Sequence, residues 1–115
     1  MRPLFHPAIR DVRLEAILHA LSDPVRVGIF VQIASAGHSK TCSAFACLGN
    51  RVIPKSSLSQ HFKILREAGL IRSERHGIEM RNTSRCEEVE QRFPGLIPAI
   101  VNAHARSAQE NSHGD

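Results

Sequence analysis

The stretch Pro54–Arg81, which reads PKSSLSQHFKILREAGLIRSERHGIEMR, decides the fold of this chain. Its first half places apolar residues at the spacing of a helix with one buried face, which predicts a helix from Lys55 to about Ala68. Gly69 follows in the position where many helices end in a left-handed residue. Beyond it the apolar period changes from about 3.6 residues to 2, which predicts two strands. His76-Gly77 between them suits the tight turn of a hairpin.

The predicted helix begins with hydroxyl and amide side chains, which suit contact with DNA. The major groove accepts an α-helix, and residues near the helix N-terminus reach the edges of the bases. Glutamine can make two hydrogen bonds to adenine, serine serves several bases, and lysine suits phosphates. The residues that we expect to contact DNA from this helix are Lys55, Ser56, Ser57, Ser59, Gln60, His61, Lys63 and Arg66.

The hairpin is predicted to be a wing along the flanking backbone or minor groove, with contacts from Arg72, Arg75, His76 and Arg81. Between residues 51 and 85 the chain has eight basic and three acidic residues, whereas all 115 residues carry a net charge of +4. This segment favours a polyanion as partner. A solvated, mildly basic surface is the alternative explanation of the charge. Together these features favour a winged helix-turn-helix over an unrelated small α+β domain.

Periodicity and capping residues predict the elements before this stretch. A first helix is expected after Pro7. A second is expected from Pro24 to about Ala36, because Ser22-Asp23-Pro24 indicates a stop followed by a new N-cap and a first-turn proline. A short third helix is expected next, with Thr41 as its cap and with Phe45 and Leu48 facing inward. This third helix would pack beneath the helix that contacts DNA.

After the hairpin, Ser84 begins a capping-box pattern that predicts a further helical stretch. Phe93-Pro94-Gly95 interrupts that stretch, and a last helix is expected from Leu96 to about Ala108. Residues 50–53 are expected to form a turn before the DNA-contacting helix. The predicted fold is therefore mainly α (α+β), a winged helix-turn-helix with the order α-α-α-α-β-β-α.

Length and composition indicate one globular domain with a thin core. The 115 residues are 42% hydrophobic and 23% charged, but only 4% are aromatic. Apolar runs are too short for a membrane span, and the first twenty residues carry charges where a signal peptide would be apolar. We therefore expect a cytoplasmic protein. No glycine-rich phosphate loop, nucleophile elbow or paired-carboxylate site occurs, so we do not expect an enzyme.

Two segments resemble the ArsR/SmtB family of bacterial repressors. Leu21-Ser22-Asp23-Pro24-Val25-Arg26 resembles the L-x-D-P-x-R opening of that family's second helix, and Ser57–Ile71 resembles its recognition helix and the entry into its wing. The resemblance covers roughly residues 8–105 and leaves residues 106–115 as a tail that we expect to be disordered. It implies a homodimer that binds a palindromic operator and releases it when an inducer binds. The positions that read DNA in the family are occupied by Ser56, Ser57, Gln60 and His61.

The family's dimer interface is formed by the first and last helices, and the apolar pattern of this chain independently favours such an interface. Both helices have more apolar surface than a small core needs, and a second subunit can complete such a core. Packing of both helices on their own domain is the alternative. The expected interface residues are Ile9, Leu14, Ile17, Leu18, Ile97, Ile100, Val101 and His104.

Three cysteines suggest that the inducer is a thiol redox or electrophile signal. Cys42 and Cys47 flank the predicted third helix, and Cys86 lies in the first turn of a later one, where the helix dipole favours the thiolate. Residues five apart in a helix are separated by roughly 7–8 Å along its axis. This lies beyond the ~7 Å limit for an unstrained disulfide. A Cys42–Cys47 bond would therefore unwind the third helix and release DNA.

Three other possibilities remain open. Thiolates bind zinc, copper(I) and arsenic(III), so a metal or metalloid held by Cys42, Cys47 or Cys86 is the main alternative, although no metal site or cofactor is predicted. The family's tight Cys-x-Cys is replaced here by Cys-x4-Cys, and its Asp-x-His by Asn102-Ala103-His104. The cysteines can also be small buried apolar residues. Lastly, some winged helices bind proteins instead of DNA, but they lose the basic recognition face.

Overall fold

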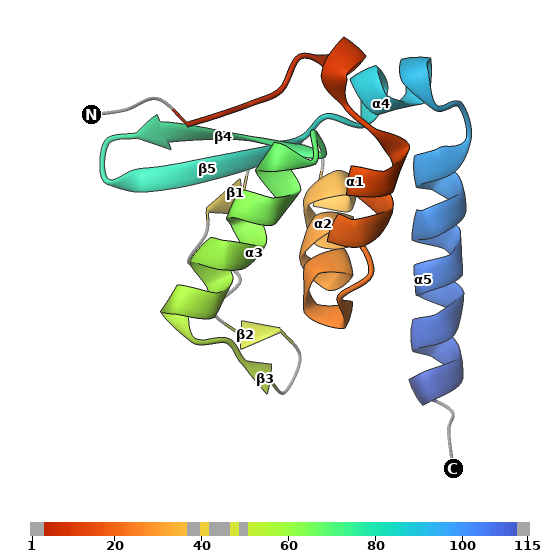
Figure 1. Cartoon of the computed structure of the whole chain (residues 1–115). Coiled ribbons are helices and arrows are strands. Elements are labelled where there is room, and N and C mark those ends of the chain that lie inside the picture. Colours follow the sequence, from red (N-terminus) through yellow and green to blue (C-terminus); the bar gives the residue numbers. More distant parts are fainter. Residues whose placement is uncertain (1–3, 37–39, 42–46, 49–50, 113–115) are drawn as a thin grey trace.

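Helix α3 and the hairpin β4–β5 form the centre of a winged helix fold, as predicted (Figure 1). The structure is a computed structural model that describes residues 4–36, 40–41, 47–48 and 51–112. In chain order the elements are η1 (Ile9–Asp11), α1 (Leu14–Ala20), α2 (Pro24–Ala36), β1 (Lys40–Thr41), β2 (Cys47–Leu48), β3 (Arg51–Val52), α3 (Lys55–Glu67), β4 (Ile71–His76), β5 (Glu79–Ser84), α4 (Cys86–Arg92) and α5 (Leu96–Ser112).

Almost every long element contributes at least one large apolar residue to the core. Ile17 of α1, Phe30 of α2, Phe62 of α3, Ile71 of β4 and Val89 of α4 are each at most 1% exposed. Because these elements are brought together only in the folded chain, the core fixes α3 and the wing relative to each other.

The turn between α1 and α2 explains much of the sequence motif around it. The backbone N–H of Arg26 donates to Asp23 Oδ2 at 3.0 Å, which caps α2 as predicted. This hydrogen bond is the main reason why the pKa of Asp23 is lowered. Arg26 is only 8% exposed, and its Nε donates to the carbonyl of Ala20 at 2.7 Å. A carboxylate and a buried guanidinium therefore hold the two helices at their bend.

The wing is an antiparallel hairpin whose register is fixed near its base. Ile71 pairs with Ser84, Ser73 with Asn82, and so on to the tip. Ser73 and Asn82 are 3% and 0% exposed, and the Ser73 hydroxyl donates to Asn82 Oδ1 at 2.6 Å. A slip by one residue would separate these two buried polar groups and expose the apolar face of the hairpin, so this register is strongly favoured.

The turn of the hairpin lies one residue later than predicted. His76 is paired with Glu79 and belongs to β4, so the turn consists of Gly77 and Ile78. Gly77 has a φ of 66°, which supplies the expected left-handed conformation. Ile78, expected in the second strand, stands at the tip and is 98% exposed.

The predicted third helix is wrong at both ends. Thr41 lies in β1, which pairs with β5, and Leu48 lies in β2, which pairs with β3. Arg51–Val52, expected in a turn, is β3. Residues 42–46, which include Phe45, lie outside the described residues. Strand pairing therefore replaces helix formation in the described parts of this segment: β1 pairs with the distant β5, and β2 pairs with the neighbouring β3.

Two other predicted boundaries differ for similar reasons. The first helix is interrupted, because residues after η1 are extended at Val12, which is 2% exposed and whose carbonyl accepts from Arg92 Nε at 2.7 Å. Ser84 does not cap a helix, because it pairs with Ile71 in the sheet; α4 starts at Cys86 with no side-chain cap. The interruption before α5 occurs as predicted, with Gly95 at a φ of 82°.

Helix α5 is longer than predicted and continues past Ala108 to Ser112. Residues 106–112, which we expected to be disordered, are therefore helical. The side chains from 105 to 110 are all exposed within one chain.

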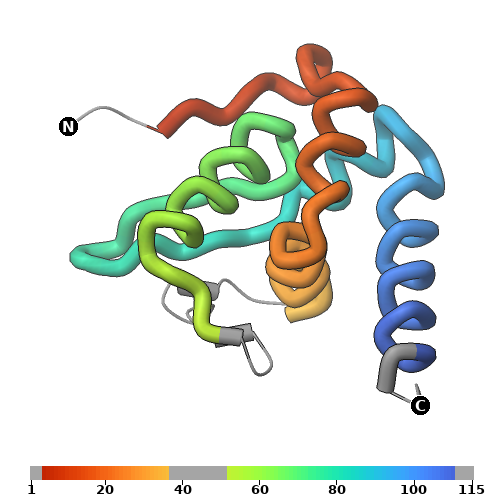
Figure 2. The backbone as a smooth tube through the Cα atoms, turned by 60° about the horizontal axis from the view of Figure 1, so that its bottom comes forward, coloured from red at the N-terminus to blue at the C-terminus, as the bar shows by residue number. Residues whose placement is uncertain are grey.

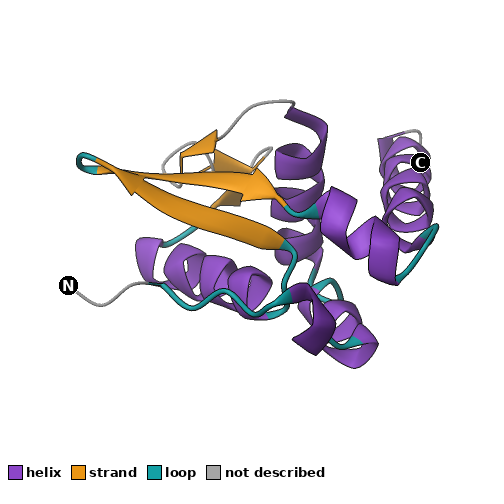
Figure 3. Cartoon of the chain, turned by 90° about the horizontal axis from the view of Figure 1, so that it is seen from above, coloured by secondary structure: helices purple, strands orange, loops and turns teal. Residues whose placement is uncertain are grey.

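The wing and α3 occupy one end of the molecule, and α5 stands at the other (Figures 1 and 2). From above, the segment before η1 runs beside the hairpin and crosses toward the helices (Figure 3). Among the described residues, no single helix has the length and apolar character to cross a membrane. Helices α1 and α2 pass that test only as a pair, and they meet at a bend of 106°.

Candidate nucleic-acid interface

The exposed face of α3 carries most of the predicted DNA-contacting residues. Leu58, Phe62 and Leu65 point into the core and are at most 6% exposed, so the opposite face of the helix is turned outward. Arg66, in the last turn, is half-buried and takes part in an interaction within the protein. The fully exposed residues are Lys55, Ser56, Ser57, Ser59, Gln60 and Lys63.

The start of α3 is itself suited to a phosphate. Pro54 precedes the helix and makes no side-chain capping hydrogen bond. The N–H groups of the first turn have no acceptor within the helix, because the earliest intrahelical bond runs from Leu58 N to the carbonyl of Pro54. Free N–H groups and the positive end of the helix dipole attract anions. Lys55 adds a full charge at the same place.

His61 is less available than its neighbours. It is half-buried against the turn between α1 and α2, and its Nδ1 is buried without a hydrogen-bond partner in the described part of the chain. Burial lowers the pKa of His61 below 6.5, with a smaller contribution from Arg26 and an opposing one from Asp23. His61 is therefore neutral at pH 7, and it offers DNA a hydrogen-bonding group but no full charge.

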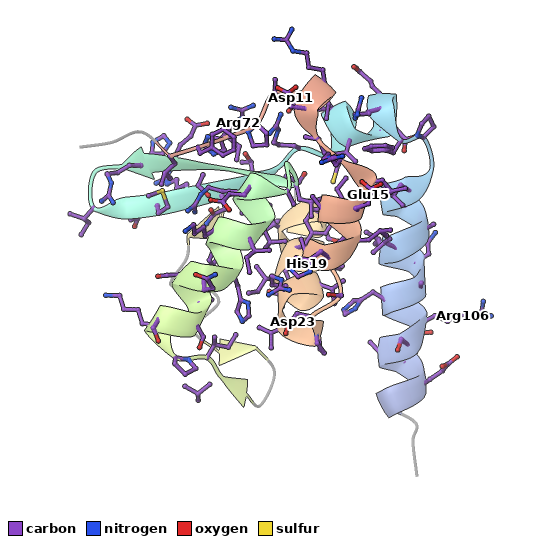
Figure 4. All side chains as sticks on the ribbon, in the orientation of Figure 1. Asp11, Glu15, His19, Asp23, Arg72 and Arg106 are labelled. Atoms are coloured by element: carbon purple, nitrogen blue, oxygen red, sulfur yellow. The ribbon has the colours of Figure 1, made fainter. Side chains whose placement is uncertain are left out.

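The four predicted wing residues are in two different situations. Arg75 and His76 are exposed near the tip, and neither has an ion-pair partner among the described residues. Arg81 lies 3.4 Å from Glu79, and Arg72 lies 3.7 Å from Glu88. Arg72 projects from the wing in Figure 4. Both arginines are more than 40% exposed, and exposed ion pairs are weak. A phosphate can therefore replace either carboxylate.

Two residues that join the wing to the N-terminal segment were not predicted from the sequence. His6 Nε2 accepts a hydrogen bond from the backbone N–H of Ser73 at 3.0 Å. Arg85 is 4% exposed and donates to the carbonyl of Pro7 at 2.8 Å. Both contacts span most of the chain, so neither leaves a local pattern in the sequence.

Of the three cysteines, the structure describes the side chain of Cys86 alone. Cys86 is the first residue of α4, as predicted, and is a half-buried free thiol. The adjacent Arg85 is bound to Glu88 through contacts of 2.9 and 3.0 Å, so its charge is shared with a carboxylate. Cys47 lies in β2, and Cys42 is outside the described residues. No group of three His, Cys, Asp or Glu side chains that could hold a metal occurs in the described part of the chain.

The predicted dimer residues divide into core and surface. Ile17 and Ile97 are 0% and 4% exposed within one chain, so they belong to its own core. Leu14 and Leu18, one turn apart on α1, are 38% and 51% exposed. The half-buried members of the set are Ile9, Ile100, Val101 and His104.

Comparison with known proteins places this arrangement in a known fold. An ArsR-like transcriptional regulator from Rhodococcus sp. RHA1 is 21% identical, with a TM-score of 0.59 over 89% of this chain and 92% of that one. A second ArsR family transcriptional regulator is 22% identical, with a TM-score of 0.57 over 89% and 98%. NolR from Sinorhizobium fredii is 24% identical, with a TM-score of 0.54 over 84% and 93%.

No family model matches the sequence, and no curated protein matches it. The likeness therefore lies in the three-dimensional arrangement: the chain has the winged helix fold of ArsR-like regulators.

Proposed function

We propose that this protein is a sequence-specific DNA-binding transcriptional regulator that acts in the cytoplasm. The observation that supports it most is the exposed, uncapped start of α3, where hydroxyl, amide and lysine side chains stand beside a basic wing. Solved structures with the same fold are named as transcriptional regulators. A protein-interaction module would not need this set of phosphate and base partners on one face.

In this proposal α3 enters the major groove with its N-terminal half. Ser56, Ser57 and Gln60 contact base edges, because their side chains are exposed, short and able to donate and accept. Lys55 and Lys63 bind phosphates on either side of the groove. The wing follows the flanking backbone and contacts it through Arg75. Arg72 and Arg81 also contact the backbone, once phosphates have replaced the carboxylates that they bind in the free protein.

Binding to a duplex from the protein's own promoter should depend steeply on salt. Each phosphate contact releases condensed counterions, so the logarithm of the association constant should fall linearly with the logarithm of salt concentration, by about 0.9 per contact. Four to six contacts from each subunit predict a slope of about −4 to −5 for one bound subunit and about twice that for a bound dimer. Fluorescence anisotropy between 50 and 300 mM salt measures it. Absence of binding at the lowest salt would contradict the proposal and favour the protein-interaction module.

We also propose that the protein works as a homodimer on a palindromic operator. Leu14 and Leu18 form an exposed apolar pair on α1, and half-buried residues of α5 lie on the other proposed interface helix. Sedimentation of the complex with the same duplex gives the stoichiometry, and two chains per duplex are expected. A single chain per duplex, with no self-association at micromolar concentration, would contradict the dimer and favour packing of both helices on their own domain.

For the signal, we propose repression that is relieved by thiol oxidation or by an electrophile. Cys86 supports this as a half-buried free thiol that follows the wing directly. Unwinding of a third helix no longer supports it, because Cys47 lies in a strand. Treatment with hydrogen peroxide should weaken operator binding, and substitution of Cys42, Cys47 and Cys86 by serine should abolish the effect. Equal affinity of the oxidised and reduced protein would exclude it, and release by zinc or arsenite alone would favour the metal alternative.

A further inference from the structure

The segment before η1 supports the outer edge of the wing (Figures 1 and 3). The strand order β1-β5-β4 makes β4 an edge strand, so alternate N–H groups of β4 point away from β5. Ser73 donates one of these N–H groups to His6 Nε2 at 3.0 Å. β4 therefore has β5 along one side and the N-terminal segment along the other.

A second contact ties the same segment to the base of the wing. Arg85 Nη1 donates to the carbonyl of Pro7 at 2.8 Å, and the guanidinium is held by Glu88 at 2.9 and 3.0 Å. Glu88 also lies 3.7 Å from Arg72 of β4. The Arg85 hydrogen bond lowers the pKa of Glu88, so this contact stays charged near neutral pH. Of the two ties, the one through His6 is the one that protonation of an imidazole would remove.

The His6 contact exists only while the imidazole is neutral. Nε2 accepts a hydrogen bond from a backbone N–H, and a proton on Nε2 would remove the acceptor and place two donors face to face. The charged groups around His6 come from three elements: Arg72 and Glu74 of β4, Arg66 of α3, and Arg85 after β5. Burial, followed by Arg72, Arg66 and Arg85, lowers the pKa of His6, and Glu74 opposes them.

We propose that His6 is a positioning residue for the wing, and that its protonation releases the N-terminal segment from β4 and weakens DNA binding. This inference rests on the proposed function only where it invokes DNA. The direct contact to Ser73 is a property of the free protein. When it is lost, the N–H of an edge strand is left to water, and the wing keeps the pairing of β4 with β5 and the contact of Arg85 with Pro7 at its base.

The expected pH dependence is opposite to that of an ordinary basic surface. Acidic pH makes an ordinary basic surface more positive, which strengthens binding to phosphates. Release of the segment acts in the other direction. His6→Gln offers an amide oxygen in place of Nε2 and does not titrate, so it keeps the contact at every pH. We expect the affinity of the wild type relative to His6→Gln to fall roughly 2- to 10-fold from pH 7.5 to 5.5, the value of one hydrogen bond.

Two measurements separate this inference from the proposed function. In the free protein, the amide nitrogen signal of Ser73 should shift together with the titration of the His6 imidazole, and it should stay constant in His6→Gln. Fluorescence anisotropy with the promoter duplex then gives the ratio of affinities at each pH. His6→Ala, which lacks the contact at any pH, should bind at pH 7.5 with the reduced relative affinity that the wild type shows at pH 5.5.

Each outcome decides a different point. A Ser73 signal that ignores the titration of His6 would overturn the contact itself. A coupled signal with an affinity ratio that is the same at both pH values would overturn the role in positioning the wing. If the protein bound no duplex at any pH, the proposed function would fail, and the spectra would still establish or reject the proton-dependent contact.

Discussion

Reversing the charge of Lys55 and Lys63 together should weaken binding to the promoter duplex by on the order of 100-fold for each bound subunit near 0.1 M salt. Both side chains are exposed on α3, one at the start of the helix and the other about two turns further along. Loss of two phosphate contacts lowers the affinity by roughly 60-fold per subunit at this salt concentration, and the two new carboxylates repel the backbone. The slope of affinity against salt should also become shallower by about 2 for each bound subunit.

A matched control for Lys55→Glu/Lys63→Glu is Arg10→Glu/Arg106→Glu. It changes the net charge by the same amount, but its residues lie on η1 and on the outer side of α5, away from α3 and the tip of the wing (Figure 4). Circular dichroism should show that both double variants are folded. If they lost affinity equally, binding would depend on net charge and not on the face of α3.

Gly69→Ala should lower the free energy of unfolding by about 2–5 kcal/mol. Gly69 has a φ of 83°, and a left-handed conformation costs an alanine roughly 1–2 kcal/mol. The new Cβ would also collide with the side chain of Val12, which is 2% exposed and cannot move aside. Overpacking of this kind costs a further 1–3 kcal/mol or so. Urea denaturation followed by circular dichroism measures the change.

Gly77→Ala isolates the two causes. Gly77 also has a positive φ, 66°, but no atom lies within 4 Å of a Cβ built there. Its substitution should therefore cost only the conformational part, about 1–2 kcal/mol. If both variants lost the same free energy of unfolding, the side chain of Val12 would have moved to accommodate the new Cβ. The close contact between Val12 and Gly69 would then add nothing to stability.

The parts of the fold that follow from local chemistry could be predicted from the sequence. The apolar spacing of Leu58, Phe62 and Leu65 gave α3, and Gly69 gave its end, because helix periodicity and a left-handed residue are properties of neighbouring positions. The change of period gave the hairpin to within one residue. Asp23 capped α2 as expected, since a cap needs only its own helix.

The parts that depend on distant partners could not be predicted. β1 consists of two residues and exists because it pairs with β5, which lies some forty positions further along the chain. A strand of two residues is too short to show an alternation of apolar and polar side chains. Ser84 is a residue type that often caps helices, but here it pairs with Ile71 in the sheet and does not cap α4. In both cases a tertiary contact overrides a reasonable local preference.

The candidate site shows the same division. Exposure of Ser56, Ser57 and Gln60 followed from the helical period, since each lies opposite the buried stripe. Burial of His61 and the carboxylate partners of Arg72 and Arg81 did not, because they come from other elements. His6 shows it best: its role depends on a hydrogen bond to a residue 67 positions away.

The buried pair of Ser73 and Asn82 has a consequence for how the wing can diversify. These side chains set the alignment of the two strands close to the core, so the residues beyond them, from Glu74 to Arg81, need only continue the same pairing toward the tip. The protruding loop can gain, lose or exchange side chains while the helices beneath it stay in place. Related proteins can thus acquire new preferences for flanking DNA without rebuilding their interior, and a designer can graft other loops at the same point.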